Sequence, residues 1–151
     1  VETVRTMAEI AEETERHIDY AKRFRTNEFV IHDRVDAISH ATCGMAIDIG
    51  AKVIVVTSMS GMTVRMVSRF RAPMDIVGMA TNKRVWYKLS LSWGVLPVLS
   101  EQFNSTDVLF YHALRAARDT MHLQPGDNVV MTGGITNGKS GNTNLIKIEA
   151  V

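Results

Sequence analysis

Residues 51–63 read A-K-V-I-V-V-T-S-M-S-G-M-T, and this stretch decides the fold. Its apolar part, residues 53–56, is short and contains no polar side chain, which is typical of a strand covered on both faces of its sheet. A polar loop follows, and then a helix is expected from about residue 63 to residue 70. A buried strand, a loop and a helix form the repeating unit of α/β sheets, so the stretch predicts an α/β fold.

The same unit recurs along the rest of the chain. Further strands are expected at residues 75–79, 95–99 and 128–132, with helices at 82–92 and 106–121. Pro97 places its strand at a sheet edge, because proline donates no ladder hydrogen bond. The last strand, residues 145–150, follows a loop without a helix, so it must return antiparallel. The sequence therefore predicts a three-layer α/β/α fold with a five-stranded mixed sheet, its last strand antiparallel to the rest.

Two helices are expected before the first strand. Residues 2–24 predict one amphipathic helix, with glutamates early and basic residues late, as the helix dipole favours. Residues 33–49 predict a second helix that ends at Gly50. The apolar stripe expected to be buried on this second helix comprises Val35, Ile38, Thr42, Met45 and Ile49. Cys43 is expected to be a small buried hydrophobe, and as the single cysteine it excludes an internal disulfide.

Composition excludes several classes of protein. The chain has 151 residues, enough for one domain, and its formal net charge of +1 gives no electrostatic reason to expect nucleic acid or a membrane surface as partner. No apolar run is long enough for a bilayer span, and residues 1–25 do not have the pattern of a signal peptide. We expect a cytoplasmic protein. No metal site is expected, because His40 has no Cys or His partner at ligand spacing.

The loop after the first strand is the first candidate site. Ligands of open α/β sheets bind beyond the carboxyl ends of the strands, and a helix N-terminus offers unpaired N–H groups with a partial positive charge. The hydroxyl groups add donors, and the glycine lets the backbone approach a ligand closely. The pattern fits a phosphate group, and a capped turn without a ligand is the alternative. The candidate phosphate-binding residues are Ser58, Met59, Ser60, Gly61, Met62 and Thr63.

A glycine-rich loop is the second candidate site. Residues 133–140 read G-G-I-T-N-G-K-S and match the Walker A pattern of nucleotide triphosphatases. A P-loop must open a helix whose amides hold the phosphates, whereas the few residues after this loop predict a strand. We interpret it as a loop that brings a lysine to the neighbouring anion site; ATP hydrolysis lost in Lys139→Ala would support the P-loop instead. Its candidate residues are Gly134, Gly138, Lys139, Ser140 and Gly141.

No reaction centre emerges from the sequence. No serine lies in a G-x-S-x-G elbow, and the paired carboxylates lie mainly on the first helix, where solvent is their expected partner. Trp86 and Trp93 are expected in the core or at an interface. We therefore predict a binding module without catalytic residues.

Six short segments of the chain together form a specific pattern. They are A-K-V-I-V-V-T (51–57), S-G-M-T (60–63), V-S-R (67–69), W-G-V-L-P-V (93–98), P-G-D (125–127) and S-G-N-T-N-L-I-K (140–147). In this order they resemble the pyruvate kinase C-terminal domain, in the bacterial form, and the resemblance covers nearly the whole chain. Residues 1–25 resemble the helix that continues from the catalytic barrel, and residues 26–151 the regulatory domain, so we expect a piece of a longer chain.

The resemblance implies a function for the parent enzyme and a role for this part of it. Pyruvate kinases transfer a phosphoryl group from phosphoenolpyruvate to ADP in glycolysis, with Mg²⁺ or Mn²⁺ and usually K⁺, all bound outside this domain. No cofactor is expected here. In allosteric members the loop matching residues 58–63 holds a phosphate of a sugar-phosphate effector, and the loop matching 134–141 closes over the sugar. The family is typically a homotetramer with an interface between these domains, and the edge strand at 145–150 favours that contact.

Two departures leave the effector open. Members that use fructose 1,6-bisphosphate often place an arginine near the start of the helix that contains residues 107–111, where this chain has no basic residue, and Met62 stands where an arginine often follows the glycine. Lys139 substitutes for these arginines, or the effector is a monophosphate such as ribose 5-phosphate, glucose 6-phosphate or AMP, or regulation is lost. A free-standing phosphate- or nucleotide-binding protein of the same fold is the alternative to a kinase domain.

Overall fold

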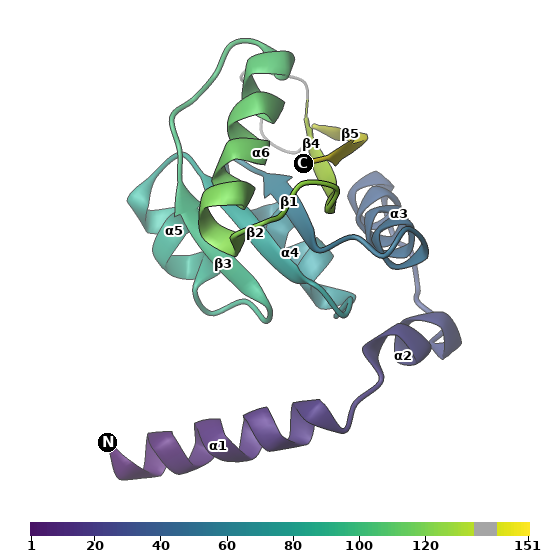
Figure 1. The fold of residues 1–151 in the computed structure, drawn as a ribbon, viewed down its shortest axis with the longest axis vertical. Helices are drawn as coiled ribbons and strands as arrows, with labels where there is room; N and C mark the ends of the chain where they lie inside the picture. Colours follow the sequence, from purple (N-terminus) through teal and green to yellow (C-terminus); the bar gives the residue numbers. More distant parts are fainter. Residues whose placement is uncertain (135–141) are drawn as a thin grey trace.

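The computed structural model describes residues 1–134 and 142–151 and contains one sheet flanked by helices (Figure 1). The strands are β1 (Val53–Thr57), β2 (Asp75–Ala80), β3 (Val95–Leu99), β4 (Asn128–Gly134) and β5 (Thr143–Ala150). The helices are α1 (Glu2–Arg16), α2 (Tyr20–Thr26), α3 (Arg34–Asp48), α4 (Met62–Arg69), α5 (Lys83–Leu89) and α6 (Thr106–Met121).

The sheet has the order β3-β2-β1-β4-β5. The strands β1 to β4 pair in parallel, with Ile54 opposite Ile76 on one side and Val130 on the other, and β5 pairs antiparallel with β4. Pro97 lies in β3, an edge strand. The predicted five-stranded mixed sheet with an antiparallel last strand is confirmed.

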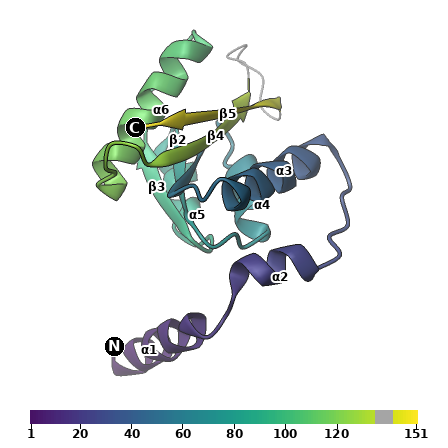
Figure 2. The same ribbon diagram turned by 45° about the vertical axis from the view of Figure 1, so that its right-hand side comes forward.

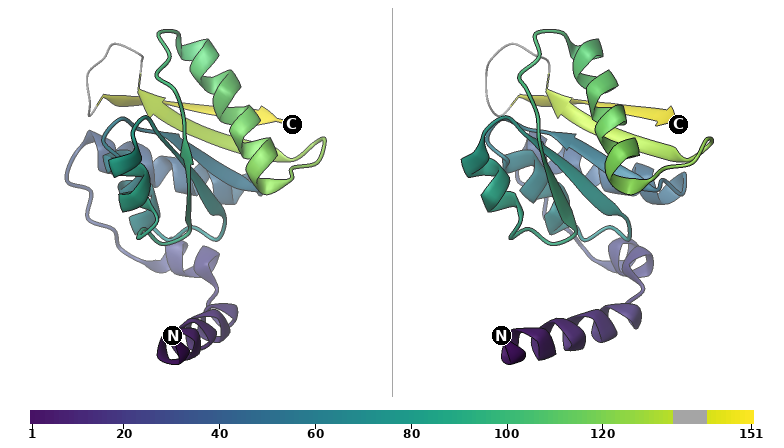
Figure 3. Two further views of the ribbon diagram at one scale, coloured as in Figure 1. Left: turned by 90° about the vertical axis from the view of Figure 1, so that its left-hand side faces the viewer. Right: turned by 60° about the vertical axis from the view of Figure 1, so that its left-hand side comes forward.

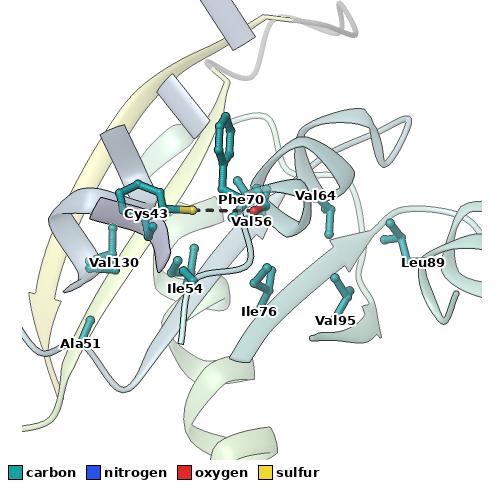
Figure 4. Close-up of a cluster of buried hydrophobic side chains, with 14 of the residues drawn as sticks. Cys43, Ala51, Ile54, Val56, Val64, Phe70, Ile76, Leu89, Val95 and Val130 are labelled. Atoms are coloured by element: carbon teal, nitrogen blue, oxygen red, sulfur yellow. Dashed lines mark hydrogen bonds between the residues drawn. The ribbon is translucent and has the colours of Figure 1, made fainter. Parts of the chain in front are cut away.

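Side-chain alternation along the strands produces two cores. One face of the sheet packs against α3, α4 and α5, and Ile54, Val56 and Ile76 are fully buried there (Figure 4). The other face packs against α6 (Figure 3). Val53 and Val55 of β1 are buried there in one cluster with Phe110 of α6. Each fully buried aliphatic side chain of this kind contributes about 1.5–3 kcal/mol. The apolar run at β1 thus stabilises both layers, as expected of a strand covered on both faces.

The prediction of one helix over residues 2–24 is wrong. Helix α1 ends at Arg16, and α2 begins after Asp19, whose carboxylate accepts a hydrogen bond from the Lys22 amide at 2.9 Å. Aspartate is a strong N-cap residue, and its cap bond competes with continuation of the preceding helix. Helix α1 therefore extends away from the sheet and has no buried residue (Figure 2).

The predicted second helix is confirmed as α3, but its buried face differs from the expected stripe. Asp33 caps its start by accepting from the Asp36 amide, and Gly50 follows its end with φ +60°. Of the five stripe residues only Thr42 is fully buried, together with the small residues Cys43 and Ala46. Small side chains let α3 lie close to the sheet, so its larger apolar residues lie at the borders of the contact.

No helix of the described residues is both long enough and apolar enough to cross a bilayer.

Candidate functional site

The loop between β1 and α4 lies at the carboxyl end of the central strand, as predicted. The Ser58 amide donates to the Met79 carbonyl at the end of β2, at 3.2 Å. Gly61 has φ +75°, and a Cβ at this position would lie 2.9 Å from Cγ1 of Val85 on α5. Both the left-handed backbone and the close contact require glycine, so Gly61 holds the loop against α5 and fixes the start of α4.

Two serine hydroxyls accept hydrogen bonds from amides in the turn that leads into α4. The Gly61 amide donates to Ser58 Oγ at 3.0 Å, and the Met62 amide donates to Ser60 Oγ at 3.4 Å. This is the geometry of a capped turn, the alternative to a phosphate site. A hydroxyl that accepts from an amide still has its own proton to donate, so both serines retain the ability to bind an anion. The two interpretations are therefore compatible.

Thr63 connects this loop to strand β5. Its hydroxyl lies 2.6 Å from the hydroxyl of Thr143, and its side chain is buried, with the residue 3% exposed. Only one proton can lie between the two oxygens, so the other hydroxyl keeps a proton for a different acceptor. Sequence reasoning named Thr63 but not Thr143, which sits 80 residues away in the chain and carries no signal of its own.

The described residues on either side of the second predicted loop lie at the end of β4 and the start of β5. Gly134 is the last residue of β4 and pairs with Thr143, and a Cβ on Gly134 would collide with the Asn142 carbonyl. A Cβ on the preceding Gly133 would collide with the hydroxyl of Thr57, the last residue of β1. The other predicted residues of this loop, Gly138, Lys139, Ser140 and Gly141, lie outside the described residues.

The Walker A pattern is not followed by the helix that a P-loop requires. Residues 142–151 hold strand β5 and no helix. The helix amides that would hold a nucleotide's phosphates are therefore missing from this part of the chain. The strand predicted after the motif is confirmed, and the role of Lys139 stays a prediction, since residues 135–141 lie outside the described residues.

One cation near the loop was missed by sequence reasoning. Arg65 lies in the first turn of α4, and its guanidinium donates to Met62 Sδ at 3.6 Å, back toward the helix start. The three-residue spacing from Met62 on one helix face is the signal that could have found it. The start of α4 thus combines the partial positive charge of a helix N-terminus with a guanidinium group.

Other parts of the described structure do not form a comparable site. Among residues 1–134 and 142–151, no three His, Cys, Asp or Glu side chains converge as a metal site would require. A groove of about 390 Å³ lies between β3 and α6, and none of the loop residues 58–63 lines it. On its rim Arg115 and Asp119 pair with one another at 3.9 Å, so two of its charges are already partnered.

Comparison with known proteins identifies the family. The family described as "Pyruvate kinase, alpha/beta domain" matches residues 36–149. The chain is similar to the pyruvate kinases of Clostridium acetobutylicum (36% identical over all of this chain and 32% of that protein) and Lactobacillus delbrueckii subsp. bulgaricus (31%, all of this chain and 26% of that protein). It is also 32% identical to that of Staphylococcus saprophyticus over 99% of this chain, and so spans between a quarter and a third of these relatives' lengths. The chain therefore belongs to the pyruvate kinase family and corresponds to its C-terminal alpha/beta domain.

Proposed function

We propose that this chain is the allosteric and oligomerisation domain of a pyruvate kinase and that it binds a phosphorylated effector at the loop of residues 58–63. The observation that carries the proposal is the convergence of hydroxyl groups at the start of α4. Ser58, Ser60 and the Thr63–Thr143 pair all present hydroxyls within or beside this loop. The helix N-terminus favours a negative charge there, typically by 0.3–1 kcal/mol.

A phosphate dianion suits this arrangement because it has acceptors only. The serine hydroxyls accept from the amides of Gly61 and Met62 and can donate outward, and such chains of hydrogen bonds strengthen one another. Arg65, in the first turn of α4, adds the positive charge that the loop itself lacks. Lys139 is proposed to contribute a second cation from the neighbouring loop. Because only Arg65 and Lys139 are proposed to supply positive charge, a monophosphate such as ribose 5-phosphate, glucose 6-phosphate or AMP fits better than a bisphosphate.

The parent activity is proposed from the family. The longer relatives are named pyruvate kinases. The reaction converts phosphoenolpyruvate and ADP to pyruvate and ATP, with Mg²⁺ or Mn²⁺ and K⁺, in the cytoplasm. We propose that those ions and substrates bind outside these 151 residues, that this chain contributes no catalytic residue, and that the remainder of a pyruvate kinase chain is its partner.

A thermal-shift panel tests the effector site. Ribose 5-phosphate, glucose 6-phosphate, AMP and fructose 1,6-bisphosphate are each added to the chain, with glucose as the control that lacks phosphate. A ligand at 100 times its dissociation constant stabilises by about 2.7 kcal/mol, which corresponds to roughly 5–10 °C in a domain of this size. No rise with any of the four phosphorylated compounds would contradict the proposal.

A pair of variants tests whether the phosphate binds at the loop of residues 58–63. Met62 is exposed at the first position of α4, so Met62→Glu adds a negative charge at the helix start without disturbing the core. The charge suits the helix dipole and leaves the fold stable, but it repels a phosphate. We expect Met62→Glu to abolish the ligand-induced rise in melting temperature and Met62→Gln to retain it. Equal rises in both variants would place the phosphate elsewhere.

A further inference from the structure

Four contacts from different parts of the chain converge on Trp93, which lies between α5 and β3. Its indole N–H donates to Glu15 Oε1 on α1 at 2.9 Å, and its ring centroid is 5.0 Å from that of Tyr20, the first residue of α2. The guanidinium carbon of Arg71 lies 5.2 Å from the Trp93 ring centroid, and the Trp93 carbonyl accepts from Ser68 Oγ at 2.7 Å. Trp93 thus joins the N-terminal helices to the α/β domain.

Helix α1 has little else to hold it. None of its residues is buried, and the figures show it apart from the sheet in every view (Figures 1, 2 and 3). Among the side-chain hydrogen bonds of the described residues, Glu15 to Trp93 is the one that links α1 to the α/β domain. This hydrogen bond ties the last turns of α1 to the Trp93 indole.

Helix α4 connects Trp93 to the loop of residues 58–63. At one end of α4, the amide of its first residue, Met62, donates to Ser60 Oγ, and the amide of the preceding Gly61 donates to Ser58 Oγ. At the other end, Ser68 in the last turn bonds the Trp93 carbonyl. Arg71, two residues beyond the helix, stacks on the Trp93 ring. Because Val64 and Val67 are fully buried between these ends, α4 is held as one packed element, and a shift at its start reaches Trp93.

We infer that Trp93 is a positioning residue that sets the direction of α1 relative to the α/β domain, and that α4 transmits to it a rearrangement of the loop of residues 58–63. The second part of this inference rests on the proposed function, whereas the first does not. When the serine hydroxyls donate to a bound anion, the loop and the start of α4 shift, Trp93 moves with Ser68 and Arg71, and α1 turns with the indole.

Distance measurement between two spin labels tests the position of α1. Cysteines are introduced at the exposed positions Glu9 on α1 and Lys88 on α5, and the buried native Cys43 stays unlabelled. Trp93→Phe keeps an aromatic ring but removes the N–H donor. Loss of one net hydrogen bond raises the fraction of molecules in which α1 is detached from Trp93 about fivefold. We therefore expect a broader distribution of distances between the two labels.

Matched variants distinguish loss of the Trp93–Glu15 hydrogen bond from general destabilisation of the fold. Trp86→Phe removes the other indole donor, which bonds the Pro97 carbonyl at 2.8 Å, and should leave the distribution narrow. Glu15→Ala should reproduce the broadening, whereas Glu12→Ala on the same helix should not. A distribution that stays narrow in both Trp93→Phe and Glu15→Ala overturns the inference.

The coupling through α4 is tested by adding the phosphorylated compounds. With ribose 5-phosphate, glucose 6-phosphate, AMP or fructose 1,6-bisphosphate at a concentration that raises the melting temperature, the mean distance should shift in the parent chain and not in Trp93→Phe. A compound that binds without shifting the distance overturns the role of α4. If none of the four binds, the proposed function fails, and the ligand-free comparison still decides whether Trp93 positions α1.

Discussion

Cys43 shows how burial sets the chemistry of a single side chain. It is fully buried on α3 and its thiol donates to the Val67 carbonyl at 3.7 Å (Figure 4). Burial raises the pKa of the thiol from 9.0 to about 12, because the apolar surroundings disfavour the thiolate. Since the thiolate is the reactive form, Cys43 is inert despite being the single cysteine.

This pKa shift predicts both reactivity and the pH dependence of stability. We expect no labelling by a thiol-specific disulfide reagent at pH 8 in the native chain and complete labelling in denaturant. The unfolded thiol loses its proton near pH 9 and the native thiol near pH 12, so the stabilising contribution is present below pH 9 and lost as the pH rises toward about 12. Cys43→Ser should remove this loss from the dependence of unfolding free energy on pH. Rapid native labelling would contradict the burial of Cys43.

Single residues also mark the limit of what sequence patterns predict. The sequence has glycine at positions 133 and 134, but it does not show why glycine is required there. The atoms that exclude a Cβ at these positions belong to Thr57 and Asn142. Likewise, Thr63 is predictable as a helix-start hydroxyl, whereas its contact with Thr143 depends on the pairing of β5 with β4. Contacts between distant segments are decided by tertiary structure, and a local motif does not contain them.

At the scale of elements, periodicity predicted where apolar faces exist but not always where helices end. The pattern of residues 2–24 continues through Asp19, yet the cap bond of this residue to the Lys22 amide starts a new helix. In α3 the largest apolar residues suggested a stripe, while the face that is buried is made of small ones such as Ser39 and Ala46. Side-chain size at a close contact outweighed hydrophobicity there.

The contrast between α1 and β1 predicts very different costs for the same substitution. Ile54 on β1 is fully buried, whereas Ile10 on α1 is 62% exposed. Ile54→Ala leaves a cavity and should lower the free energy of unfolding by about 2–5 kcal/mol. Ile10→Ala should change it by less than about 0.5 kcal/mol. Urea unfolding of both variants measures this, and a loss above 1 kcal/mol in Ile10→Ala would mean that α1 is packed against something in this chain.

At the scale of the molecule, topology was predictable because few alternatives satisfy the rules of connection. A strand that follows a short loop must be antiparallel to the strand before it, which predicted the direction of β5. A strand that contains proline must lie at a sheet edge, and β3, which contains Pro97, does so. The candidate site followed from the same topology, since the loop after β1 lies at the carboxyl end of the central strand. The angle of α1 was not predictable, because it depends on contacts between segments far apart in the sequence, such as Glu15 with Trp93.

The exposed edge of β5 gives the last prediction. Strand β5 pairs with β4 on one side and has no strand on its other side among the described residues. An unpaired edge is a template for pairing with another chain, and we propose that two copies of this domain meet there. Ile148 on β5 is 46% exposed, so Ile148→Lys places a charge at this edge without emptying the core.

We expect Ile148→Lys to lower the mass of the assembly measured by light scattering, with the melting temperature of the domain nearly unchanged. Leu91→Lys is the matched control, because Leu91 is an apolar residue, 91% exposed, that follows α5 and lies outside β5. A charge there adds the same electrostatic repulsion between copies but leaves the β5 edge intact. If both variants keep the parent mass, or both lose it equally, assembly does not depend on the edge of β5, and a different surface joins the copies.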